Sequence, residues 1–229
     1  MDNCFFNRMA ESKTMNVYFI SGLGADRKAF ERIKLPSKFS PHYLDWIPPL
    51  QNESLDDYAK RIAEGIDTSQ PFSVVGLSMG GMIASSMTSF LHPEKTILIS
   101  SIGCNKEFPP LLRFARKTRA YKLLPEFIFR SKNVGVIQRL FGTKTKNEKA
   151  LISYFISRLD PTFMKWAIGA IINWQNCERP KQIFHIHGNK DKMFPVKYTV
   201  PDAIIKNGSH FMVWTKAGEV SKILEQALA

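Results

Sequence analysis

The pentapeptide Gly76-Leu77-Ser78-Met79-Gly80 constrains the fold of this chain more than any other stretch of its sequence. It follows the apolar run 72–75 and precedes the helix-like stretch 81–87, so a strand must turn into a helix at the serine. Glycine fits two residues before and two after the serine, where the backbone is crowded, because it has no Cβ. The turn would present the Ser78 hydroxyl at a strand end, next to an N–H at a helix N-terminus, where negative charge is stabilised. Ser78 is therefore a candidate nucleophile.

Apolar runs alternate with helix-like segments on both sides of this turn. Strands are predicted over 16–20, 42–47, 72–75, 96–100, 182–186 and 203–205. Helices are predicted over 26–34, 55–66, 81–91 and 216–228. Such alternation implies right-handed crossovers, and therefore an α/β fold with a mainly parallel sheet covered by helices on both faces. Ligands of such sheets bind at the carboxyl ends of the strands.

The region between the fourth and fifth predicted strands differs, since residues 103–180 contain helix-like segments and no convincing strand. Helices are predicted there over 113–124, 134–141, 148–158 and 161–174. The aromatic and apolar content exceeds what a solvated surface needs, so we expect a helical cap whose apolar side chains partly line a pocket above Ser78. The predicted organisation is a flexible N-terminal extension (1–14), an α/β core (15–102 and 181–229) and the cap insertion (103–180).

Length and composition are those of one globular α/β domain: 229 residues, 44% apolar and 23% charged. No stretch reaches the roughly 18 apolar residues of a membrane span. The first fifteen residues also lack the apolar centre of a signal peptide, so we expect a cytoplasmic location without stable membrane insertion. Cys4, Cys104 and Cys177 are few, odd in number and widely spaced, which favours reduced thiols over disulfides or a metal site.

The net charge of +12 is concentrated in the insertion, where 103–180 holds fifteen Lys/Arg against five Asp/Glu, a net +10. This excess favours anionic substrates, acidic partners or a membrane surface. A solvated basic surface with no dedicated partner fits the same pattern. No nucleic-acid recognition module is recognisable, so nucleic-acid binding is not expected. The oligomeric state does not follow from the sequence.

An acid and a histidine follow Ser78 in an informative order. Asp191 lies just after the fifth predicted strand, and His210 follows the last one. The order Ser, Asp, His would place all three on loops at the carboxyl ends of successive strands. The alternatives are that Asp191 serves only its turn, that Asp202 or Asp160 supplies the acid, and that His210 is a buried structural histidine.

On these residues and their order the chain resembles the α/β-hydrolase superfamily, specifically its small capped members, over roughly residues 16–228. The resemblance implies that Ser78 is the nucleophile, that His210 is its general base and then acid, and that Asp191 orients the imidazole. It also implies that the backbone N–H groups of Met79 and Leu23 bind the oxyanion. Many relatives carry His-Gly where this chain has Ser21-Gly22, which bears on the hydrogen bonding of that loop.

What the resemblance implies for function is two-step acyl transfer to water: hydrolysis of a carboxylic ester or thioester through an acyl-enzyme. The substrate would be a small acyl compound, with an anionic one favoured by the basic cap, and no metal or organic cofactor would be needed. A serine at position 78 disfavours the dehalogenases and epoxide hydrolases of the same fold, which use aspartate there. The alternatives are a carbon–carbon hydrolase or lyase using the same triad, an acyltransferase, and a receptor-like ligand-binding protein.

Overall fold

The computed structural model describes residues 14–119 and 134–229. Within them, strands β1 to β6 form one six-stranded sheet in the order β2-β1-β3-β4-β5-β6, with every neighbouring pair parallel. The strands are β1 Met15–Ile20, β2 Phe39–Leu44, β3 Phe72–Leu77, β4 Thr96–Ile99, β5 Ile183–Gly188 and β6 Ala203–Ile205. The order reverses direction between β1 and β3, which marks the carboxyl ends of these two strands as the place for a binding crevice.

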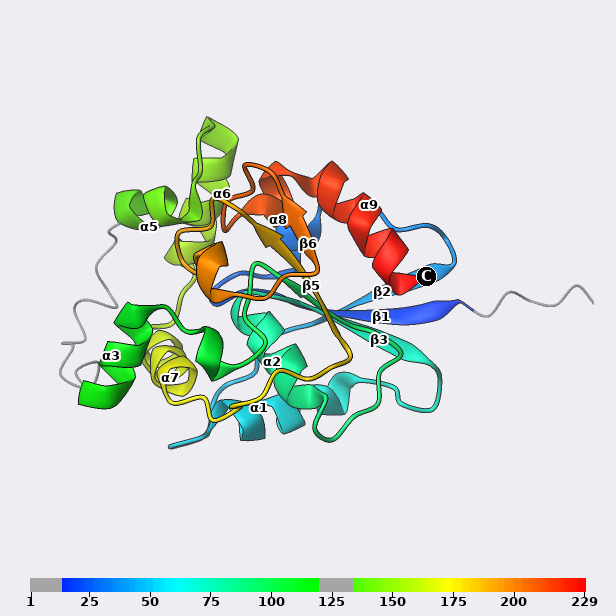
Figure 1. Ribbon diagram of the computed structural model, residues 1–229, viewed down its shortest axis with the longest axis horizontal. Helices are drawn as coiled ribbons and strands as arrows, with labels where there is room; N and C mark the ends of the chain where they lie inside the picture. Colours follow the sequence, from blue (N-terminus) through cyan, green and yellow to red (C-terminus); the bar gives the residue numbers. More distant parts are fainter. Residues whose placement is uncertain (1–13, 120–133) are drawn as a thin grey trace, which may run out of the picture.

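Helices cover both faces of this sheet (Figure 1). One face carries α1 Leu55–Ile62 and α2 Met79–Met87, and the other carries α8 Met212–Thr215 and α9 Ala217–Leu228. Alternate strand residues divide between the two cores: Tyr18 and Val74 pack with α1 and α2, and Val17 and Val75 with α9. Burial on both faces explains the continuous apolar strand runs and confirms the predicted fold class.

The helix predicted over 26–34 is wrong in length. Only a short 3-10 helix forms, η1 Arg27–Phe30, and the Asp26 carboxylate caps it by accepting the Lys28 N–H at 2.8 Å. The chain then turns, with the Ile33 N–H donating to the Phe30 carbonyl at 2.8 Å. This single turn already buries Phe30 against the sheet, and no further helix is needed before β2.

The second strand lies nearer the N-terminus than the predicted 42–47. It pairs with β1 from Met15 opposite Phe39 to Ile20 opposite Leu44. Its Pro41 lacks an N–H, which an edge strand tolerates.

Two predicted helices also end or divide differently, and a third forms as predicted. The second predicted helix, 55–66, becomes α1 and one 3-10 turn, η2 Ala63–Gly65. The helix after Ser78 ends at Met87 rather than at residue 91, because the Thr88 hydroxyl and N–H both bond to carbonyls of the last turn. The predicted helix 216–228 forms as α9, and the short α8 before it was not predicted.

Four described helices lie between β4 and β5: α3 Pro110–Thr118, α5 Val134–Phe141, α6 Lys146–Ser157 and α7 Pro161–Ile172. They lie beyond the carboxyl ends of the strands (Figure 1), and the described part of the insertion contains no strand. Part of the predicted helix 113–124 falls outside the described residues, as does nearly all of the predicted extension 1–14. The division into core and cap stays a prediction. In the described parts of the chain, no helix combines the length and apolarity needed to cross a membrane.

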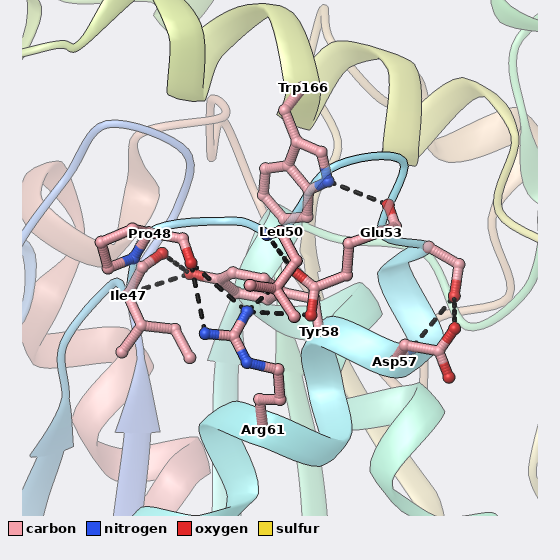
Figure 2. Close-up of polar contacts among 9 residues, drawn as sticks. Ile47, Pro48, Leu50, Glu53, Asp57, Tyr58, Arg61 and Trp166 are labelled. Carbon is pink, nitrogen blue, oxygen red and sulfur yellow. Dashed lines mark hydrogen bonds and ion pairs between the residues drawn. The ribbon is translucent and has the colours of Figure 1, made fainter.

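A buried carboxylate holds the loop between β2 and α1 (Figure 2). Arg61 donates to both oxygens of Glu53 at 2.9 Å, and the Leu50 N–H donates to one of them at 2.8 Å. Only 3% of the Glu53 side chain is exposed. The Glu53 backbone carbonyl accepts the indole N–H of Trp166 on α7 at 2.9 Å. This loop therefore ties α1 to the inserted helices.

Tyr58 of α1 holds the same loop through its side-chain hydroxyl (Figure 2). Its hydroxyl donates to the Ile47 carbonyl at 2.8 Å and accepts the Ile47 N–H at 2.9 Å. Burial raises the pKa of Tyr58 to about 12. The hydroxyl thus keeps its proton and both bonds throughout the range in which the protein would work.

We expect Arg61→Met to lower the free energy of unfolding by about 2 kcal/mol, because the buried Glu53 carboxylate loses its charged partner. Lys60→Met is the matched control on the same helix, since Lys60 pairs with Asp57 in an ion pair whose side chains are 61% and 60% exposed. Its loss should be clearly smaller. Urea unfolding followed by circular dichroism measures both, and equal losses would contradict the assigned role of Arg61.

Candidate active site

Ser78 occupies a strained turn between β3 and α2. Its φ of 53° and ψ of −118° lie where side-chain-bearing residues rarely occur, a conformation that costs on the order of 1–3 kcal/mol. The Ser78 N–H donates to the Ile99 carbonyl at 3.0 Å, and the Ser101 hydroxyl donates to the Ser78 carbonyl at 2.6 Å. These bonds from the end of β4 hold the strained residue in place.

Close backbone packing explains the two glycines that flank this turn. A Cβ on Gly76 would overlap the backbone of Gly80, and one on Gly80 would overlap the carbonyls of Ile20 and Ser21. The turn therefore packs directly against the end of β1. A Cβ built on Gly22 would lie 3.3 Å from the Ser78 Cβ, so the loop after β1 passes beside the serine.

Three side chains that the sequence singled out meet at this turn. The His210 Nε2 lies 3.0 Å from the Ser78 Oγ, and its Nδ1 lies 2.8 Å from Oδ2 of Asp191. Because an ionised carboxylate only accepts, Nδ1 carries the proton and Nε2 is left to accept the serine hydroxyl. The arrangement can remove a proton from Ser78 and stabilise the resulting imidazolium.

Asp191 is held in its ionised form within the protein. Its Oδ1 accepts the backbone N–H groups of Met193 at 2.8 Å and Phe194 at 2.9 Å. Burial raises the pKa of Asp191, but the neighbouring His210 and His187 imidazoles and the Phe194 N–H outweigh burial, so the pKa lies below its ordinary value. A full negative charge therefore faces His210.

The alternative acids are engaged elsewhere. Asp160 caps α7 by accepting the N–H groups of Thr162 and Phe163. Asp202 pairs with Arg179 at 3.0 Å and accepts the His185 N–H at 2.7 Å. Of the three acids considered from sequence, Asp191 is the one in contact with His210.

Two backbone N–H groups border the same space. Met79 begins α2 and Leu23 lies in the loop after β1, and both line the cavity at Ser78. Neither N–H donates to another group in the described part of the chain. The Ser21 hydroxyl donates to the Ala25 carbonyl at 2.6 Å, which closes this loop where many relatives carry histidine. The role of these two N–H groups as oxyanion donors stays a prediction.

Ser78 and His210 lie in the wall of a cavity of about 440 Å³. Its other walls are mainly apolar and come largely from the inserted helices. Among these residues are Leu112 of α3, Leu140 of α5, Phe155 of α6, and Ile168 and Ile171 of α7. Sequence reasoning predicted such a pocket from the apolar content of the insertion but did not identify its residues.

Phe141, at the end of α5, was missed as a site residue. Its ring meets the His210 ring edge-on at 5.0 Å between centroids, and the Phe194 ring meets it at 5.7 Å. The Phe141 carbonyl also accepts the Phe211 N–H at 3.3 Å. An inserted helix thus contacts the candidate base, which no spacing in the sequence indicates.

The remaining polar groups offer no further chemistry of this kind. No group of three or more His, Cys, Asp or Glu side chains among residues 14–119 and 134–229 is placed to hold a metal ion. Cys104 is buried and Cys177 exposed, and both are free thiols.

His185 and His187 of β5 are fully buried, and their facing ring nitrogens lie 2.9 Å apart. His185 is thus packed in the core and engaged in a hydrogen bond. Burial holds the pKa of His185 well below its ordinary value and also lowers the pKa of His187. Both rings are therefore neutral in the folded protein near pH 7.

We expect the free energy of unfolding to fall between pH 7.5 and 5.0, because the pKa values of both buried histidines are lowered in the folded protein. The unfolded chain takes up these protons below its ordinary pKa of about 6.5, whereas the folded protein resists them, so acid favours unfolding. Urea titrations at the two pH values test this in the wild type and in His185→Gln. A pH dependence in His185→Gln as steep as that of the wild type would contradict it.

Comparison with protein-family models finds no match, and neither does comparison with curated proteins. Among solved structures, lip1 from Acinetobacter baumannii AYE has a TM-score of 0.72 at 14% identity, covering 95% of this chain and 84% of that one. A lipase-esterase related protein from Clostridium acetobutylicum ATCC 824 has a TM-score of 0.67 at 15% identity, covering 94% and 95% of the two chains.

A third neighbour, olei00960, a hydrolase from Oleispira antarctica, has a TM-score of 0.67 at 17% identity, covering 93% of this chain and 90% of that one. At such identities the similarity shows the fold alone. Combined with the parallel sheet and the strand-turn-helix at Ser78, it shows that this chain has the α/β-hydrolase fold that its sequence resembles.

Proposed function

We propose that this protein is a serine hydrolase that cleaves a carboxylic ester or thioester through an acyl-enzyme. The observation that carries the proposal is the contact chain from the Ser78 Oγ through His210 to Asp191, opening into an apolar cavity. A serine alone is a weak nucleophile, and a neighbouring base oriented by a carboxylate activates it.

In the first step the Ser78 Oγ attacks the substrate carbonyl carbon while His210 Nε2 takes the hydroxyl proton. The oxygen–carbon bond forms, and the carbonyl oxygen becomes an anion that the N–H groups of Met79 and Leu23 bind. The imidazolium, stabilised by Asp191, then gives its proton to the departing alcohol or thiol as the bond to that group breaks.

In the second step water attacks the acyl group on Ser78. His210 takes a proton from the water, the same two N–H groups bind the second oxyanion, and the serine leaves with the proton returned by the imidazolium. The released acid and the free enzyme complete the cycle.

The structural neighbours support ester hydrolysis in general. One is a lipase-esterase related protein, and another is a thermophilic esterase from Thermogutta terrifontis, with a TM-score of 0.62 at 14% identity. The apolar cavity walls agree with a substrate whose acyl or alcohol part is hydrophobic. The preference for anionic substrates inferred from the charge of 103–180 stays a prediction.

Ser78→Ala should lower p-nitrophenyl ester hydrolysis at least about a thousand-fold, because the acyl-enzyme cannot form. The assay uses esters from acetate to palmitate with wild type and variant in parallel. Intact mass and peptide mapping after a fluorophosphonate probe should place one adduct on Ser78 of the wild type and none on the variant.

Each other outcome has a distinct meaning. An adduct on Ser78 without ester turnover would favour the carbon–carbon hydrolase, lyase or receptor alternatives. Neither adduct nor turnover would contradict the assignment of Ser78 as a nucleophile.

Ile168→Trp should narrow the cavity and lower kcat/KM for long acyl chains at least about tenfold more than for acetate. A tenfold loss corresponds to the burial of about two methylene groups of the acyl chain. Val136→Trp is the matched control, since Val136 is 59% exposed on α5 and does not line the cavity. The ester series measures both. Equal losses for all chain lengths in Ile168→Trp would show that Ile168 does not contact the acyl chain.

A further inference from the structure

A chain of buried polar contacts continues behind Asp191, away from Ser78. The His187 Nε2 lies 2.7 Å from the Phe194 carbonyl oxygen, and its Nδ1 lies 2.9 Å from the His185 Nε2. Both histidines are fully buried on β5, the strand that leads into the Asp191 loop. None of these groups takes part in the mechanism described above.

The protonation of this pair follows from its partners. The Phe194 carbonyl can only accept, so His187 Nε2 must carry a proton and donate it. Burial keeps the ring neutral, so His187 Nδ1 is an acceptor, and the N–H at His185 Nε2 donates a hydrogen bond to it. The direction of the chain is therefore from His185 through His187 to Phe194.

Phe194 receives this bond and contacts both members of the acid–base pair. Its N–H donates to Asp191 Oδ1 at 2.9 Å, and its ring meets His210 edge-on. Fixing the Phe194 carbonyl therefore fixes the turn that wraps the carboxylate. We propose that His187 is a positioning residue that, through Phe194, aims Oδ2 of Asp191 at His210.

The geometry explains why the hydrogen bond from His187 to the Phe194 carbonyl affects the orientation of the Asp191 carboxylate as well as the packing around it. Asp191 Oδ1 is held by the N–H groups of Met193 and Phe194, which leaves Oδ2 to His210. His187 Nε2 lies 3.6 Å from Oδ2, too far for a hydrogen bond but near enough to act on the carboxylate directly, while its hydrogen bond to the Phe194 carbonyl orients the turn. If that turn rotates, both Oδ1 bonds change, and the carboxylate plane turns with them.

Two substitutions at position 187 separate this bond from the rest of the side chain. In His187→Gln the amide nitrogen can occupy the place of Nε2 and donate to the Phe194 carbonyl. In His187→Asn the amide oxygen replaces Nδ1 and still accepts from His185, but the side chain is too short to reach Phe194. His185→Asn is the matched control, the same change two residues earlier on the same strand.

The catalytic part of the inference rests on the proposed hydrolase function, so the experiment includes a readout that needs no turnover. The proton between His210 Nδ1 and Asp191 gives a strongly deshielded NMR resonance, assigned by its loss in Asp191→Asn. We expect this resonance to shift or broaden in His187→Asn and to remain in His187→Gln and His185→Asn. Far-ultraviolet circular dichroism checks that each variant is folded.

For ester hydrolysis, kcat/KM of His187→Asn should fall about tenfold, mainly through kcat. This loss corresponds to the removal of about one hydrogen bond. The acid limb of its kcat/KM profile should move to lower pH, because a misaligned carboxylate stabilises the imidazolium less. His187→Gln should recover most of the activity, and His185→Asn should keep the wild-type pH profile.

An unchanged resonance and pH profile in His187→Asn would overturn the proposal, and so would equal changes in His185→Asn. If His187→Asn does not fold, His187→Gln decides: loss of the resonance in that folded variant would overturn it. Wild-type protein without ester turnover but with the expected NMR pattern would refute the hydrolase function and leave the positioning role supported.

Discussion

Direct backbone contact at the Ser78 turn is the constraint on which the rest of the site depends. Gly80 touches the carbonyls at the end of β1, and Gly76 touches Gly80, so two strand ends and a helix start meet without side chains between them. The serine is thereby held at a positive φ of 53° with its hydroxyl turned toward His210. The helix N-terminus and the loop after β1 reach the same point because the packing brings them there.

Much of this could be predicted from the sequence, since it depends on local chemistry. The strand, turn and helix at Ser78 and its two flanking glycines follow from rules that act within a few residues. The meeting of Ser78, Asp191 and His210 was expected from their order along the chain and from the family that this order resembles. Other features depend on distant partners. Phe141 meets His210 across 69 positions of sequence, and the length of the 26–34 helix was set by the path into β2, so neither could be read from local pattern.

The inserted helices are fastened to the body on two sides of the cavity. On the side of α1 and α2, the Trp174 indole donates to the Ser86 hydroxyl at 2.9 Å, and Trp166 reaches the loop before α1. On the other side, the Tyr154 hydroxyl contacts Asp26 at 3.1 Å, and Phe141 packs against the loop of His210. The cavity lies between these attachments, and its walls are held by helices and loops from different parts of the chain.

Phe141 both lines the cavity and packs against His210. In the proposed hydrolase, a substitution at position 141 would change both the cavity wall and the surroundings of the proposed base, His210, whereas one at Ile168 on α7 would change the cavity wall. If the protein is the proposed hydrolase, we expect its homologues to carry the substitutions that alter substrate range on α7, while position 141 stays aromatic. The α7 wall of the pocket would then vary in sequence with the substrate, and the wall that contains position 141 would be conserved.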